Sequence, residues 1–121
     1  MAYFKINLNE AKNNNYFRKE VYTSNKAQIV LMSLLPNEDI GEEIHADVDQ
    51  ILIFADGRGK AILNQSEFEI KEDDVLYIPH STEHNIINTG SEEMKIISIY
   101  APPEHPRGTI HDTKAEALKQ D

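Results

Sequence analysis

Four side chains that can bind a metal ion fall in two blocks of the sequence. Glu43 and His45 are two residues apart, so on a strand both point to the same face. Gln50 breaks this even spacing by one residue, and a β-bulge within 46–49 would return its side chain to that face. The second block is a proline-led turn that ends at His84, whose imidazole would approach the first block from the opposite side. The spacing therefore predicts one site built from these four residues.

The donor atoms of this set indicate which ions it suits. A carboxylate, an amide oxygen and two imidazoles form a mixed nitrogen and oxygen site with one formal negative charge. Such a site favours Fe, Mn, Ni or Zn over Ca or Mg, and two histidines with one carboxylate also resemble the facial triad of non-haem iron oxygenases. In the alternative interpretation the cluster holds no metal, and its polar groups hydrogen-bond a ligand or each other.

Three further polar residues lie close to these blocks in the sequence. Asp47 and Asp49 are expected to be solvated turn or bulge residues, although either could replace Glu43 if the strand register shifts. His80 precedes His84 by four residues, which is the spacing of a helical zinc pair. Strand-forming residues on both sides favour a position for His80 at the rim of the site instead.

The elements that must position these residues are short strands. Segments rich in β-branched and aromatic residues alternate with turn residues, which predicts an all-β sandwich or barrel. Residues 51–54 are apolar on both faces, as expected for a central strand covered by a second sheet or by a partner subunit, and we expect a homodimer. We predict ten strands, at residues 3–7, 16–23, 27–35, 43–47, 50–56, 59–64, 67–71, 75–79, 84–88 and 94–101.

The C-terminal part, 101–121, is predicted to be a tail with a short helix at 112–119. Asp112 or Thr113 can cap this helix. Before it, the proline-rich loop cannot extend a strand ladder. His105 and His111 lie in this tail and are expected to be exposed loop histidines; alternatively, the tail closes the mouth of the barrel and lends one of them to the site.

Composition limits the kinds of protein that this chain can be. Its 121 residues suit a single domain, 1–121, and the absence of cysteine removes disulfides and thiolate sites. A net charge of -9 opposes nucleic acid and anionic lipid surfaces, and no apolar run reaches the length of a membrane span. The first ten residues lack the apolar stretch of a signal peptide, so we expect a cytoplasmic protein.

Both blocks together resemble the paired motifs of the cupin family. The first runs from Asn37 to Gly57, the second runs from Asp73 to Asn88, and fifteen residues separate them. Every step between motif positions has the family spacing. The Tyr-Ala-Pro-Pro-Glu-His stretch at 100–105 is also similar to the ends of small stand-alone bacterial cupins. The resemblance implies a double-stranded β-helix, or jelly-roll barrel, with a short C-terminal helix.

Several residues depart from the motifs while keeping their spacing. Asn37, Asp73 and Ser81 stand where glycine is usual. Glu43 replaces the first histidine ligand and Gln50 replaces the glutamate, so His45 and His84 are the ligands that match in identity.

The resemblance implies a divalent transition metal and a small oxygenated or sugar-like metabolite as ligand or substrate. Isomerisation and dioxygenation are the reactions that it implies most often. A non-catalytic cupin that binds a small molecule through an altered or vestigial metal site is the alternative, and catalytic residues are not assigned.

Overall fold

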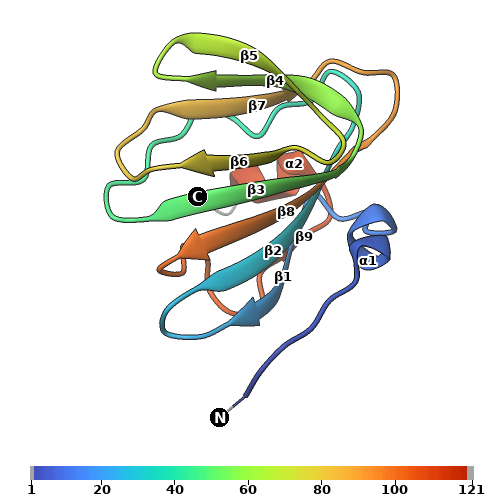
Figure 1. Ribbon diagram of the computed structural model, residues 1–121. Coiled ribbons are helices and arrows are strands. Elements are labelled where there is room, and N and C mark those ends of the chain that lie inside the picture. Colours follow the sequence, from blue (N-terminus) through green and yellow to red (C-terminus); the bar gives the residue numbers. More distant parts are fainter. Residues whose placement is uncertain (1, 120–121) are drawn as a thin grey trace.

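The computed structural model describes residues 2–119, which form nine strands and two short helices (Figure 1). In chain order the elements are α1 (Leu8–Lys12), β1 (Arg18–Thr23), β2 (Gln28–Leu34), β3 (Asp49–Asp56), β4 (Arg58–Leu63), β5 (Ser66–Lys71), β6 (Val75–Ile78), β7 (His84–Asn88), β8 (Met94–Ala101), β9 (Ile110–His111) and α2 (Lys114–Lys119). The all-β prediction is confirmed, and β7 and β8 have the bounds expected from the sequence.

The strands form two antiparallel sheets that face each other as a jelly-roll barrel (Figure 1). The larger sheet has the order β6-β3-β8-β2-β1-β9, and the smaller sheet has the order β5-β4-β7. Strand β8 therefore lies between β3 and β2, and it pairs with both along most of its length. One end of the barrel, which we call the mouth, is formed where β2, β3 and β7 begin and β8 ends.

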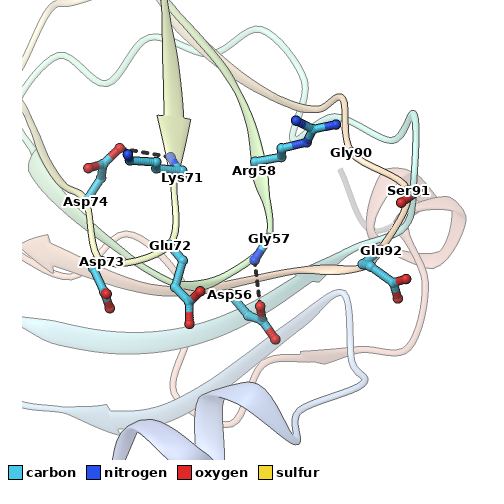
Figure 2. Close-up of a pocket in the computed structure, with 10 residues that line it drawn as sticks. All are labelled: Asp56, Gly57, Arg58, Lys71, Glu72, Asp73, Asp74, Gly90, Ser91 and Glu92. Atoms are coloured by element: carbon cyan, nitrogen blue, oxygen red, sulfur yellow. Dashed lines mark hydrogen bonds between the residues drawn. The ribbon is translucent and has the colours of Figure 1, made fainter.

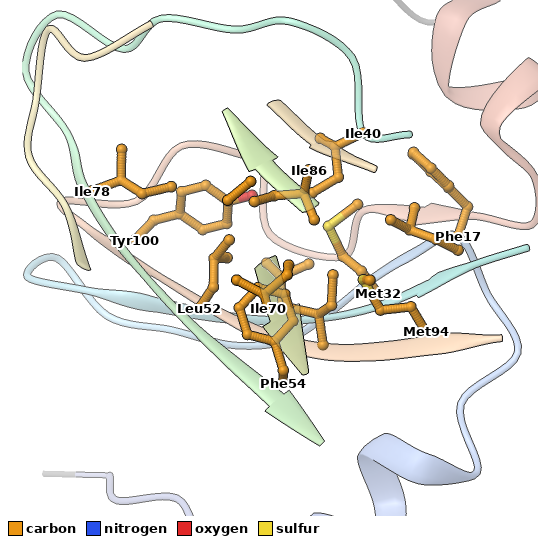
Figure 3. Close-up of a cluster of buried hydrophobic side chains, with 14 of the residues drawn as sticks. Phe17, Met32, Ile40, Leu52, Phe54, Ile70, Ile78, Ile86, Met94 and Tyr100 are labelled. Atoms are coloured by element: carbon orange, nitrogen blue, oxygen red, sulfur yellow. The ribbon is translucent and has the colours of Figure 1, made fainter. Parts of the chain in front are cut away.

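Alternating side chains of the two sheets fill the space between them (Figure 3). In β3, Leu52 and Phe54 are buried and point inward, and in the facing sheet Ile70 and Ile86 are buried against them. Burying each such side chain stabilises the fold by about 1.5–3 kcal/mol. The interior below the mouth is therefore a packed hydrophobic core.

The N-terminal segment covers part of the outer face of the larger sheet. Ala11 of α1 is buried in a second hydrophobic cluster with Leu31 and Ile97. Farther towards the N-terminus, Phe4 stacks on Tyr22 with ring centroids 5.2 Å apart. Residues 51–54 are apolar on both faces partly because Ile53, on the outer face, packs against this second cluster within the same chain.

The strand predicted at 3–7 is wrong. These residues form no strand ladder, and the chain enters α1 directly after them. The Asn7 side chain accepts a hydrogen bond from the backbone N–H of Asn9 at 2.9 Å, which caps the helix. This capping chemistry outweighed the alternating pattern of the preceding residues.

The strand predicted at 43–47 is also wrong. The segment belongs to the connection between β2 and β3, which runs beside β7 of the smaller sheet through isolated bridges from Asp39 to Ile87 and from Glu43 to His84. Between those bridges Gly41 has a φ of 103°, a conformation that interrupts a regular ladder. The expected bulge within 46–49 is a bend before β3 begins, not an extra residue in a strand.

Three motif positions that usually carry glycine adopt left-handed backbone conformations. The φ angles are 69° at Asn37, 77° at Asp73 and 65° at Ser81, and Gly57 at the end of the first motif has 89°. Asparagine and aspartate tolerate this region better than serine does. Asn37 and Asp73 can therefore form these turns with less strain than Ser81.

The predicted C-terminal helix is confirmed, with its first residue at Lys114. Thr113 caps it, because its hydroxyl accepts a hydrogen bond from the Glu116 N–H at 3.1 Å. The Lys114 ammonium contacts Asp39, and Ala117 is buried against the main core, so the helix is tied to the barrel. Neither helix within 2–119 has the length and apolar character needed to cross a membrane.

Candidate functional site

Glu43, His45 and His84 lie together at the mouth. Glu43 and His84 exchange two backbone hydrogen bonds of 2.9 and 2.8 Å, which places their side chains next to each other. The imidazole of His45 lies 5.3 Å from that of His84, measured between ring centroids. Its Nε2 is 3.4 Å from a carboxylate oxygen of Glu43. These three predicted residues therefore converge, although not on a regular strand.

Polar contacts at Nδ1, a hydrogen bond for His84 and a carboxylate contact for His45, orient both imidazoles. The Nδ1 of His84 lies 2.9 Å from the carbonyl oxygen of Thr82, which can only accept, so this nitrogen carries the proton. The Nδ1 of His45 lies 3.4 Å from a carboxylate oxygen of Glu104. Metal-binding histidines have such partners on the nitrogen that does not coordinate the ion. The arrangement leaves Nε2 of each ring as the nitrogen for a ligand.

Gln50 supplies an unusual acceptor at the same end of the barrel. The residue is 3% exposed, and its amide N–H donates to the Ser98 hydroxyl at 2.9 Å. Its amide oxygen is buried and has no hydrogen-bond partner among residues 2–119. A buried acceptor without a partner costs about 1–3 kcal/mol. A cation or a ligand hydrogen at this oxygen would remove that cost.

Tyr100 is a buried member of the mouth that the sequence analysis did not single out. It pairs directly with Gln50 across β3 and β8. Its ring meets His45 edge-on, with centroids 6.2 Å apart. Burial raises the pKa of Tyr100 to about 12, although a hydrogen bond with Ser98 opposes the shift. The phenol is therefore neutral at physiological pH.

The tail covers the mouth and contributes two residues to it. The Gln28 amide oxygen accepts from the backbone N–H groups of Glu104 and His105 at 3.2 and 3.0 Å, and its N–H donates to the His105 carbonyl at 2.7 Å. We call these three bonds the Gln28 clamp. The clamp sets the Glu104 carboxylate beside His45 and the His105 ring 5.1 Å from that of Tyr100.

The tail histidines are therefore not exposed loop residues as expected, and that prediction is wrong. His111 is 7% exposed and lies in β9, which pairs with β1. His105 is half-buried, and burial lowers its pKa to about 3. The alternative interpretation, a tail that closes the mouth, agrees with the structure, but Glu104 is the tail residue that touches a predicted ligand. Sequence reasoning missed Glu104 and Gln28, because nothing local marks Gln28 as a clamp.

Asp49 and His80 lie on the outside of the barrel. Asp49 accepts hydrogen bonds from the Tyr77 hydroxyl and from the His80 N–H, and these bonds lower the pKa of its carboxyl. It adjoins inward-pointing Gln50, so it faces the opposite side of the sheet and does not replace Glu43. The expectation that Asp49 is a turn or bulge residue is wrong, because it is the first residue of β3, whereas Asp47 lies in an exposed bend as expected. The His80 side chain is 62% exposed.

A separate pocket of about 650 Å³ lies at the other end of the barrel (Figure 2). It is formed where β3 ends at Asp56 and where Asp73 and Asp74 turn between β5 and β6. Arg58 and Lys71 line it together with these acids. Since Gln50 is at the beginning of β3, this pocket is separated from the mouth by the length of the barrel core.

The residues at the mouth fit a metal ion in part. Two oriented imidazoles, a nearby carboxylate and the orphaned Gln50 oxygen form a donor set of the kind that transition metals accept. Within residues 2–119, however, no three His, Cys, Asp or Glu side chains are grouped as a metal-binding cluster. A metal at the mouth would thus depend on Gln50 as a ligand.

Comparison with known proteins decides the family. The cupin domain model matches residues 30–100, which include both motif blocks. The chain is a cupin. It is 45% identical over 122 residues to the uncharacterized protein YrkC of Bacillus subtilis, a match that covers 95% of this chain and 66% of that protein. This cupin therefore spans slightly less than two thirds of the length of that relative.

Solved structures agree with this assignment. Protein BH2720 of Bacillus halodurans superposes on the cupin with a TM-score of 0.94 and 41% identity, covering 96% of this chain and 93% of that one. A predicted oxalate decarboxylase of Thermotoga maritima has a TM-score of 0.63 and 26% identity, covering 65% and 70% of the two chains. The fold of this cupin is thus shared across nearly its whole described length.

Proposed function

We propose that this protein is a metal-binding cupin that binds or acts on a small oxygenated or sugar-like metabolite at the mouth. The observation that carries the proposal is the Gln50 amide oxygen, a buried acceptor with no partner among residues 2–119. It lies on the same barrel end as two imidazoles whose Nδ1 atoms face acceptors. A cation held by these donors would satisfy the acceptor and coordinate both Nε2 atoms, of which that of His45 lies 3.4 Å from the Glu43 carboxylate.

The proposed ligands are Glu43, His45, Gln50 and His84, and the proposed ion is Fe, Mn, Ni or Zn. When bound, such an ion supplies Lewis acidity to an oxygen of the metabolite. The protein residues have separate roles: Glu104 and the Thr82 carbonyl orient the two imidazoles. The description of one solved relative as a predicted oxalate decarboxylase also supports a small oxygen-rich compound.

Tyr100 is suited to positioning such a metabolite. Its phenol is neutral at physiological pH, and burial raises its pKa further, so it can donate a hydrogen bond to an oxygen atom without carrying charge. The Gln28 clamp keeps the tail over the mouth and limits access of water to the site. Isomerisation and dioxygenation remain the proposed reaction types.

Metal analysis of matched histidine variants tests the proposal. The wild-type protein, purified and then loaded with each of the four metals, is expected to retain one ion per chain after dialysis. His45→Ala is expected to retain none, whereas His80→Ala, which removes an exposed rim imidazole, should behave as wild type. Stoichiometric metal in His45→Ala, or none in the wild type, would contradict a metal centre at the mouth.

A metal-free cupin that binds a small molecule is the second candidate. It is favoured by the absence of a three-residue His, Cys, Asp or Glu cluster in the described part of the chain and by the neutral amide of Gln50. In that case the orphaned oxygen would accept a hydrogen bond from the ligand. A thermal-shift screen of sugars and small acids with a chelator present separates this candidate, because ligand stabilisation would then persist without metal.

We also propose a homodimer formed through the outer face of β6 and β3. Val75 and Tyr77 of the edge strand β6 are 66% and 54% exposed on this face, and Ile51 beside them is half-buried. Exposed apolar side chains on an edge strand favour association with another sheet. Size-exclusion chromatography with light scattering tests the oligomeric state, and a monomeric mass at micromolar concentration would count against the homodimer.

A further inference from the structure

Arg18 is a buried cation in a strongly acidic chain. The residue is 8% exposed, and it pairs with Met32 across β1 and β2, so its side chain begins on the inner face of the larger sheet. A guanidinium stays charged at any pH that a protein survives. No Asp or Glu of residues 2–119 forms an ion pair with it.

The neighbours of Arg18 do not neutralise this charge. One terminal nitrogen lies 3.2 Å from Nδ1 of His111, and the guanidinium carbon lies 5.2 Å from the centroid of the Phe17 ring. The Nε–H group is buried and has no hydrogen-bond partner in the described part of the chain. An unpaired charge with an unused donor is strongly unfavourable in a protein interior. An anion beside Arg18 would remove both penalties.

A pocket of about 420 Å³ opens next to this side chain. It lies between Arg18 on β1 and the tail segment that leads into β9, and it is lined by Arg18, Arg107, His105 and His111 with four neutral residues of the tail. No carboxylate is among its described lining residues, although the chain has 21 Asp and Glu against 12 Lys and Arg. We call this cavity the Arg18 pocket.

We propose that the Arg18 pocket binds the carboxylate of a small organic acid. The planar guanidinium fork matches the two oxygens of a carboxylate. Of the two arginines that line the pocket, Arg18 is the buried one, because Arg107 is exposed and already donates to the Thr23 carbonyl at 2.8 Å. A monoanion would therefore balance the buried positive charge of Arg18. A phosphate dianion would exceed that single charge in a protein that is already negative.

The Arg18 pocket adjoins the mouth through one histidine. His105 lines the pocket, and its ring lies 5.1 Å from that of Tyr100, which in turn contacts His45. Two side chains, His105 and Tyr100, would therefore separate a bound acid from the proposed metal ligand His45. Anion binding at Arg18 does not rest on the proposed metal centre, because none of its donors belongs to that ligand set.

Two-dimensional ¹H–¹⁵N spectra of the chelator-treated full chain test the proposal. The probe is sodium acetate, titrated at constant ionic strength against sodium chloride, with inorganic phosphate as a separate arm. The side-chain Nε–H signal of Arg18 is expected to shift saturably with acetate and not with chloride. Absence of an acetate shift would overturn the proposal, and tighter binding of phosphate would overturn its assignment to a carboxylate.

Variants of matched arginines separate this site from general charge effects. Arg18→Met is expected to lower acetate affinity about ten- to a hundredfold, as loss of a charge-assisted hydrogen bond would. Arg58→Met, at the opposite end of the barrel, should leave the affinity unchanged. If Arg18→Met does not fold, Arg18→Lys keeps the charge without the fork and should still lose about tenfold. Equal losses in the Arg58 and Arg18 variants would refute the site.

Discussion

Replacing Gln28 with alanine is expected to release the tail from the mouth while leaving the barrel folded. Gln28 is fully buried, and three of its hydrogen bonds, at 2.7, 3.0 and 3.2 Å, hold the backbone of Glu104 and His105. At about 1 kcal/mol for each bond, the clamp contributes about 3 kcal/mol to the closed state of the tail. That free energy corresponds to roughly a hundredfold change in the opening equilibrium.

Hydrogen exchange measures this opening residue by residue. The amide protons of Glu104 and His105 should lose roughly a hundredfold of protection in Gln28→Ala, while the amides of β7 keep theirs. His80→Ala, a change at the exposed rim, is the control and should alter neither set. Unchanged protection at 104 and 105 in Gln28→Ala would refute the clamp, and equal loss throughout β7 would show that the barrel itself was destabilised.

The other predictions concern single residues of the turns and the mouth. Ser81→Gly should stabilise the fold by about 0.5–1 kcal/mol in urea unfolding because serine is strained at a φ of 65°, whereas Asn37→Gly should change little. Gln50→Glu should bind metal about tenfold more tightly by calorimetry, yet destabilise the metal-free protein by about 1–3 kcal/mol through its buried carboxylate. The pKa of His105 is lowered to about 3 in the folded protein, whereas in the unfolded chain it is about 6.5. As pH falls below about 6.5 the unfolded chain therefore binds a proton that the folded protein does not, and the free energy of unfolding decreases until about pH 3. His105→Asn should remove this decrease in the free energy of unfolding, which amounts to about 2 kcal/mol at pH 5; urea unfolding of the metal-free protein at several pH values measures it.

The barrel could be predicted from the sequence because its signals are local. Strands β7 and β8 combine β-branched residues with turn residues at both ends, so their bounds follow from the chain itself. The spacing of the motif positions adds the left-handed turns at Asn37, Asp73 and Ser81, which the structure contains. Errors occurred where a local cap or a crossing segment replaced an apparent alternation, as at Asn7 and at Gly41.

The mouth could be predicted only in part, for a different physical reason. His45 and His84 stand at motif positions, so spacing alone brought them together. Gln28 and Glu104 join the site through contacts between residues about 76 positions apart, and no local pattern encodes such a contact. Arg18 was missed in the same way, since its burial follows from the pairing of β1 with β2 and β9.

The central position of β8 has a consequence for how the protein is made. Strands β2 and β3 are not neighbours: β2 can pair with β1 and β3 with β6, but the second edge of each is paired only when residues 94–101 have left the ribosome and inserted between them. Until then the nascent chain exposes two unpaired strand edges with apolar side chains such as Leu31 and Ile53. Folding should thus begin late in synthesis, and a chain interrupted before β8 is expected to aggregate and not to form half a barrel.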